Sequence, residues 1–242
     1  MGYAISILAI AFLALSADYA VSEPTEIAKV GTWHGSEGPM SPGDGWWGLF
    51  PVEGGYVLES AEVTVVPDSP PMGDKTGGRT GKKLSISQKT EPLFLVRGAN
   101  RLKEGPVVSL ALPPEGTFLY PGQALNLTQT KEGVTDLESL VALGTYAKLE
   151  ESYYGFSGYR LRLISETSPT RESQVVASVS ICDPYSGPRI FWAGDLDGDG
   201  KTDLFLDISK YEINSHFVLY LSSAAKEGEL VGLVGEWITL GC

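Results

Sequence analysis

Histidine and cysteine are scarce in this chain, which holds two of each: His34, His216, Cys182 and Cys242. A protein zinc site usually takes three or four ligands, mostly His and Cys, and a serine-hydrolase triad needs a histidine beside its nucleophile. His216 alternates with apolar neighbours, as a structural side chain on a strand does. The sequence therefore argues against zinc chemistry and against a histidine-based hydrolase.

Positive charge is also in short supply. Lys and Arg number 18 against 30 Asp and Glu, so the net charge is −12 and the isoelectric point is near 4.6. Proteins that bind nucleic acid or anionic membranes present basic surfaces, because contacts with phosphate groups supply much of the affinity. We therefore expect no nucleic-acid partner.

Long apolar runs are absent after residues 4–15. That run is followed by small residues, fits a signal peptide, and is too short for a typical membrane-spanning helix. No Lys or Arg precedes it, which departs from the usual signal peptide, and a buried N-terminal helix is the alternative. The sequence predicts a signal peptide over residues 1–22, cleaved after Ser16 or Ser22. It also predicts a periplasmic or secreted location and no integral membrane span in the mature chain.

The two cysteines, Cys182 and Cys242, form an even pair. In an exported protein such a pair predicts a disulfide, with two free thiols as the alternative. The bridge would close a loop of about 60 residues, which is worth about 4 kcal/mol in the loop-entropy description.

Carboxylate groups are abundant, and they are concentrated in one loop. Four aspartates fall within nine residues, at loop positions 1, 3, 5 and 9: Asp195, Asp197, Asp199 and Asp203. Gly200 at position 6 allows a sharp turn, and the backbone carbonyl of Lys201 at position 7 is a natural further ligand. Carboxylates this close repel one another without a cation, and hard oxygen donors favour Ca²⁺ over zinc or copper. The spacing therefore predicts a calcium site made by these five residues.

The flanking residues distinguish this loop from an EF-hand, which has a bidentate Glu at position 12, where this chain has Leu206. Residues 189–193 and 204–208 favour strands on either side of the loop. The run Gly-Asp-Leu-Asp-Gly-Asp-Gly-Lys-Thr-Asp-Leu-Phe-Leu resembles the calcium loop of the FG-GAP and VCBS repeats of integrin α-subunit propellers and of many secreted bacterial proteins. The resemblance covers only this loop. It implies the same four Asp ligands, the Lys201 carbonyl, and a calcium ion that rigidifies a hairpin.

Short segments of alternating apolar and polar residues recur between turns, which favours an all-β, mainly antiparallel fold. The expected strands are 56–66, 84–88, 93–97, 107–112, 117–120, 123–128, 159–164, 175–181, 189–193, 204–208, 217–221 and 230–238. For residues 135–149 two alternatives stay open: a short helix behind a capping box at Thr135–Glu138, and a strand over 140–149. Residues 222–228 favour a turn or one helical turn.

This number of strands favours a β-sandwich or two packed β sub-domains with at most one short helix. The pair Pro113-Pro114 marks the expected boundary between sub-domains 23–112 and 113–242. A complete propeller needs repeated motifs, and this chain has one Asp-rich loop and no internal repeat.

The leading expectation for function is a non-enzymatic exported protein with a structural calcium ion. One alternative is a module that binds a glycan or another extracytoplasmic protein through Trp46, Trp47 or the aromatic residues of 153–159. A tryptophan pair suits sugar stacking, although at least one of two such residues usually lies in the core. The second alternative is a hydrolase whose acids are carboxylates that the sequence does not pair.

Overall fold

The computed structural model describes residues 25–35, 37, 41–69, 81–110, 112–113, 115–127, 129–131, 134–149, 154–167, 170–209 and 214–239. In these ranges every strand pairing is antiparallel and there is no α-helix. The predicted all-β, mainly antiparallel fold is therefore confirmed. No helix within the described ranges has the length and apolar character needed to cross a membrane. The predicted signal peptide and Cys242 lie outside them.

The larger sheet has 11 strands, in the order β1-β6-β3-β4-β7-β13-β14-β15-β16, with β5 paired to β4 and β2 to β5. Their bounds are β1 Glu26–Ala28, β2 Gly31–His34, β3 Gly43–Val52, β4 Gly55–Asp68, β5 Gly81–Ile86, β6 Leu95–Arg97, β7 Gly105–Ser109, β13 Arg189–Asp195, β14 Asp203–Asp207, β15 Ser215–Leu221 and β16 Gly232–Thr239. Strand β7 links the two parts of this sheet, because it pairs with β4 on one side and with β13 on the other.

The smaller sheet has five strands, in the order β12-β11-β10-β8, with β9 paired to β10. Their bounds are β8 Ala124–Asn126, β9 Gln129–Lys131, β10 Val134–Lys148, β11 Tyr154–Thr167 and β12 Thr170–Cys182. Residues 134–148 form strand β10, so of the two alternatives for residues 135–149 the strand is confirmed and the short helix is wrong. Leu140 and Ala142 are buried at alternate positions, and β10 pairs with β11 along most of its length.

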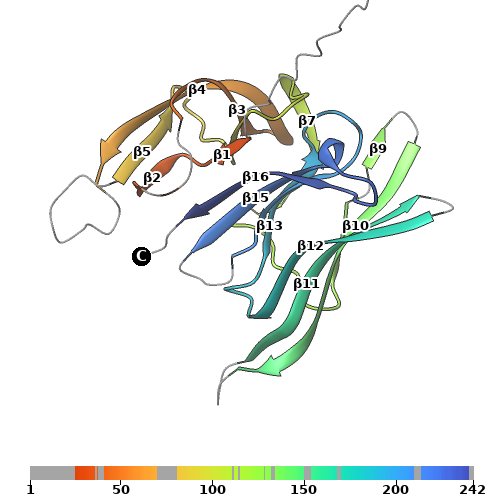
Figure 1. Cartoon of the computed structure of the whole chain (residues 1–242). Coiled ribbons are helices and arrows are strands. Elements are labelled where there is room, and N and C mark those ends of the chain that lie inside the picture. Colours follow the sequence, from red (N-terminus) through yellow and green to blue (C-terminus); the bar gives the residue numbers. More distant parts are fainter. Residues whose placement is uncertain are drawn as a thin grey trace, which may run out of the picture.

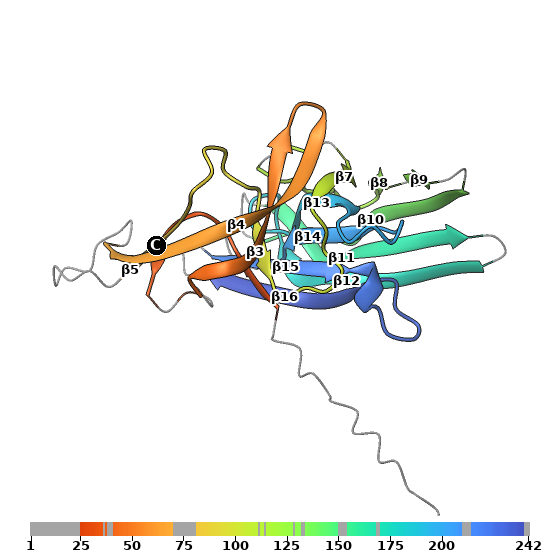
Figure 2. The same cartoon turned by 90° about the horizontal axis from the view of Figure 1, so that it is seen from above.

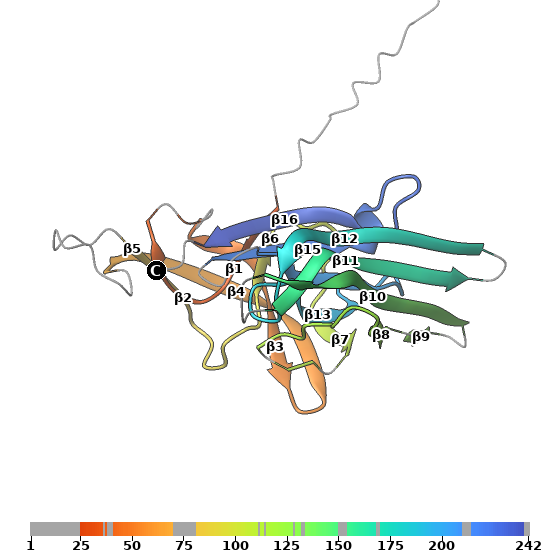
Figure 3. The ribbon, with the colours of Figure 1, turned by 90° about the horizontal axis from the view of Figure 1, so that it is seen from below.

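Two of the three apolar cores place β13–β15 between two outer layers (Figure 1). The first core lies against the smaller sheet and joins Leu163 to Leu204 and Leu206. The second core lies under the N-terminal strands and contains Phe94 and Phe205. Strand β14 is therefore buried on both faces, which explains its uninterrupted apolar run. The β3–β4 hairpin projects from the side of these layers (Figures 2 and 3).

The remaining sequence expectations agree in part with this architecture. A 3₁₀ turn, η1 (Ser222–Ala224), follows β15, where a turn or one helical turn was expected. The strand expected over 117–120 is reduced to a single bridge between Thr117 and Ile190. The division into two sub-domains at Pro113 stays a prediction.

Candidate metal centre

The Asp-rich loop connects two central strands of the larger sheet. It spans residues 196–202 between β13 and β14, which pair with each other directly. Gly198 and Gly200 have φ angles of 75° and 89°, in the left-handed region that favours glycine. At these two glycines the chain reverses direction, and it does so between two strands that pack in the apolar cores.

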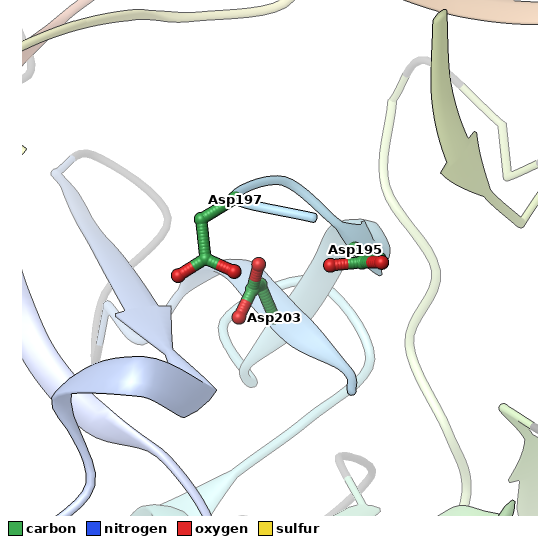
Figure 4. Close-up of side chains that lie close together, drawn as sticks. All are labelled: Asp195, Asp197 and Asp203. Atoms are coloured by element: carbon green, nitrogen blue, oxygen red, sulfur yellow. The ribbon is translucent and has the colours of Figure 1, made fainter. Parts of the chain in front are cut away.

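Three of the predicted carboxylates converge at this loop (Figure 4). One carboxylate oxygen of each of Asp195, Asp197 and Asp203 lies within 4.8 Å of the others. All three side chains are buried, and Asp203 has no exposed surface. Buried like charges at this separation are costly unless a proton or a cation compensates them. Oxygen donors in this arrangement can hold a hard metal ion.

Backbone N–H groups orient the carboxylates. Asp203 accepts hydrogen bonds through both oxygens, from the N–H of Leu196 and from the N–H of Ser222, each at 2.7 Å. Asp195 Oδ2 accepts one from the N–H of Gly200 at 2.9 Å. Asp203 thereby ties the start of the loop to the turn η1 that follows β15.

Two serines that the sequence did not single out contact the loop from η1. Ser222 Oγ donates to Asp199 Oδ2 at 2.8 Å, and Ser223 Oγ donates to Asp197 Oδ2. These serines lie more than 20 residues after the aspartates they contact. The pairing of β14 with β15 brings η1 beside the loop. Only a tertiary contact map would have identified them.

Burial shifts the acidity of Asp203. Loss of hydration raises the pKa of its carboxyl from the ordinary 3.8 to about 8, and the charges of Asp197 and Asp199 push it in the same direction. Hydrogen bonds from the backbone of Ser222 and Leu196 act in the opposite sense. Without a cation, Asp203 therefore holds a proton at neutral pH, and a bound cation would have to displace that proton.

Asp199 and Lys201, the other two predicted ligands, lie at the outer side of the loop. Asp199 is exposed and stands outside the group of three carboxylates. Its Oδ1 accepts the N–H of Lys201 at 2.9 Å. The ligand role of the Asp199 carboxylate and of the Lys201 carbonyl stays a prediction.

A cavity of about 240 Å³ lies beside the loop. Its lining consists of Asp195, Leu196, Asp197 and Gly198 together with residues 103–107. Asp195 and Asp197, two of the three converging residues, therefore border a space that can hold water molecules. Ca²⁺ needs six to eight oxygens, so water in this cavity can supply those that the protein does not.

The tryptophan pair does not form a sugar-binding platform. Trp46 is 1% exposed, and its indole N–H donates to the carbonyl oxygen of Ser41 at 2.9 Å. Trp47 is partly buried against the second core. Successive residues of a strand point to opposite faces, so these rings cannot share one surface. The prediction that Trp46 stacks on a ligand is wrong, because β3 directs its ring into the third apolar core, which also contains Phe50 and Leu95.

Cys182 is buried at the end of β12, and burial raises the pKa of its thiol to about 11, with the charge of Asp183 adding to the effect. Its predicted partner, Cys242, lies outside the described residues. The disulfide therefore stays a prediction.

No protein-family model, no curated protein and no solved structure matches this chain. The likeness to FG-GAP and VCBS repeats rests on the loop sequence alone. The convergence of Asp195, Asp197 and Asp203 is a feature of the structure and does not depend on that likeness. It therefore supports a metal site independently.

Proposed function

We propose that this chain is an exported calcium-binding β protein in which calcium has a structural rather than a catalytic role. The observation that carries the proposal is the convergence of three buried carboxylates, Asp195, Asp197 and Asp203. Export is inferred from the apolar run at residues 4–15.

Calcium suits this site better than magnesium or zinc. The donors available are carboxylate and carbonyl oxygens on an irregular loop, and Ca²⁺ accepts six to eight such ligands in flexible geometry. Mg²⁺ demands a near-ideal octahedron, and zinc prefers nitrogen and sulfur ligands. We infer a shell of Asp195, Asp197 and Asp203, completed by Asp199, the Lys201 carbonyl and water.

The position of Asp203 supports a structural role for the ion. Asp203 begins a strand that is buried on both faces, and its hydrogen bonds join the loop to η1. A cation held by Asp197 and Asp203 would fix the two side chains that accept hydrogen bonds from Ser222 and Ser223, and so would hold the β13–β14 hairpin against the end of β15. It would thereby resist separation of three central strands.

The alternative of a hydrolase gains little from the raised pKa of Asp203. A general acid with a raised pKa must reach its substrate. Asp203 is 0% exposed, and both of its oxygens accept backbone N–H groups. This carboxyl is therefore poorly placed to protonate a substrate.

A direct binding measurement tests the proposal. Calcium affinity of the mature chain is measured by competition with a chromophoric chelator. We expect Asp197→Ala to weaken binding at least about tenfold, or about 1.4 kcal/mol, because a buried ligand oxygen is lost. Asp199→Ala should also weaken calcium binding, because we infer that the Asp199 carboxylate belongs to the shell.

The matched control is Asp44→Ala, which removes an exposed carboxylate of β3. It changes the net charge equally and should leave the affinity unchanged. If the wild-type chain binds no calcium, or if Asp44→Ala weakens binding as much as Asp197→Ala does, the site is misassigned.

A further inference from the structure

Three exposed tyrosines gather at one end of the smaller sheet. Tyr146 is 69% exposed, and Tyr120 and Tyr154 are each 48% exposed; we call these three residues the tyrosine patch. Strand register pairs Tyr146 with Phe156 and Lys148 with Tyr154. Directly paired residues share a face of the sheet, so Lys148 belongs to the same surface.

Ring contacts fix the orientation of the patch. Tyr146 stacks on Tyr154 with centroids 5.6 Å apart and meets Phe156 edge-on at 5.9 Å. Tyr120 meets the same Phe156 ring edge-on at 5.9 Å. Phe156 itself is buried and stacks on Phe118. The exposed rings are therefore held before any ligand arrives, which lowers the entropy cost of binding.

We propose that the tyrosine patch binds a neutral glycan. Tyrosine offers a rigid apolar ring and a hydrogen-bonding hydroxyl, the combination that suits a sugar, whose ring faces are apolar and whose rim carries hydroxyl groups. The Lys148 ammonium supplies a further donor on the same face. The site is separate from the calcium loop and does not depend on the proposed function.

The size of the patch favours a glycan over a protein partner. A tyrosine side chain buries about 150–250 Å² when it is fully covered, so the exposed parts of the three rings offer about 300 Å². A stable protein–protein interface buries about 800 Å² on each partner. The net charge of −12 opposes acidic polymers and favours an uncharged ligand.

Affinity electrophoresis of the full mature chain tests this inference. Native gels contain a soluble β-glucan, a xylan or a galactomannan as neutral probes, and alginate as an acidic probe. We expect at least one neutral polysaccharide to retard the wild-type chain. Tyr146→Ala and Tyr120→Ala should each weaken retardation about fivefold or more, whereas Tyr146→Phe, which keeps the ring, should stay within about twofold.

Ile238→Ala is the control, because Ile238 is 50% exposed, about as much as Tyr120 and Tyr154, but lies on β16 in the larger sheet. It should not change retardation, and thermal unfolding of each variant shows that it is folded. Absence of retardation by every neutral probe, retardation by alginate alone, or an equal loss in Ile238→Ala would overturn the inference. Loss of retardation on adding a chelator would also overturn it, since the glycan would then bind through calcium.

Discussion

Asp203 combines full burial with an ionisable side chain and two backbone hydrogen bonds. Its raised pKa, about 8, lies above the ordinary 3.8, so the proton on Asp203 stabilises the calcium-free fold. That contribution is fully present below about pH 4 and is lost as the pH rises through about 8. Bound calcium would reverse this preference for the protonated form, because a metal ligand must be ionised.

Calcium affinity should therefore depend on pH. Below pH 8 each ion that binds releases a proton from Asp203, so the apparent affinity should rise by up to about tenfold per pH unit and level off above pH 8. The measurement is the dissociation constant between pH 6 and pH 9. In Asp203→Asn the side chain at position 203 no longer titrates, so its contribution to the pH dependence of the calcium affinity should disappear. An affinity of the wild-type chain that stays flat across this range contradicts the role given to Asp203.

At the residue scale the sequence was informative where the residues that converge are close together in the chain. The spacing of Asp195, Asp197 and Asp203 identified the residues that converge. The contacts of Ser222 and Ser223 could not be found, because they depend on which hairpins lie side by side. The burial of Trp46 was equally hidden, since a strand with tryptophans at adjacent positions can bury either one.

Among the elements, the short contact between β7 and β13 supports the site. Only Ser109 and Val108 of β7 pair with Gly194 and Asp195 of β13. A Cβ atom at Gly194 would lie 2.9 Å from Ser109 Cα and would clash with the carbonyl oxygen of Val108. Glycine is therefore required where these two strands approach.

Gly194→Ala should push β7 away from β13 and lower the free energy of unfolding by about 1–3 kcal/mol. It should also weaken calcium binding, because the adjacent Asp195 shifts with the strand. Urea unfolding and calcium titration measure the two effects. Gly55→Ala is the control: a Cβ there meets nothing within 4 Å, so both quantities should stay near wild type. Equal behaviour of the two variants would show that β7 does not position the loop.

The kind of element was easier to predict than its partners. Alternation identified most strands, and β14 was expected because an apolar run follows the loop directly. In β10 the capping-box residues Thr135 and Glu138 favoured a helix locally, but pairing with β11 decided for a strand. Long-range pairing of this kind overrides local preference.

For the whole molecule, the proposed metal site lies where the layers meet. The loop begins and ends on strands that contact both cores, and Asp203 connects it to η1. Sequence patterns predicted an all-β sandwich-like fold without a propeller. They could not predict that β7 continues the sheet from the N-terminal strands into β13, because two residue pairs leave no signature in the sequence.

Thermal unfolding of the mature chain with calcium and with a chelator tests the central claim most directly. A ligand at 100 times its dissociation constant stabilises the fold by about 2.7 kcal/mol, which raises the Tm of a chain of this size by several degrees. We predict that rise with calcium, its loss with chelator, and little recovery with magnesium. An identical Tm with calcium and with chelator would contradict a structural calcium site at Asp195, Asp197 and Asp203.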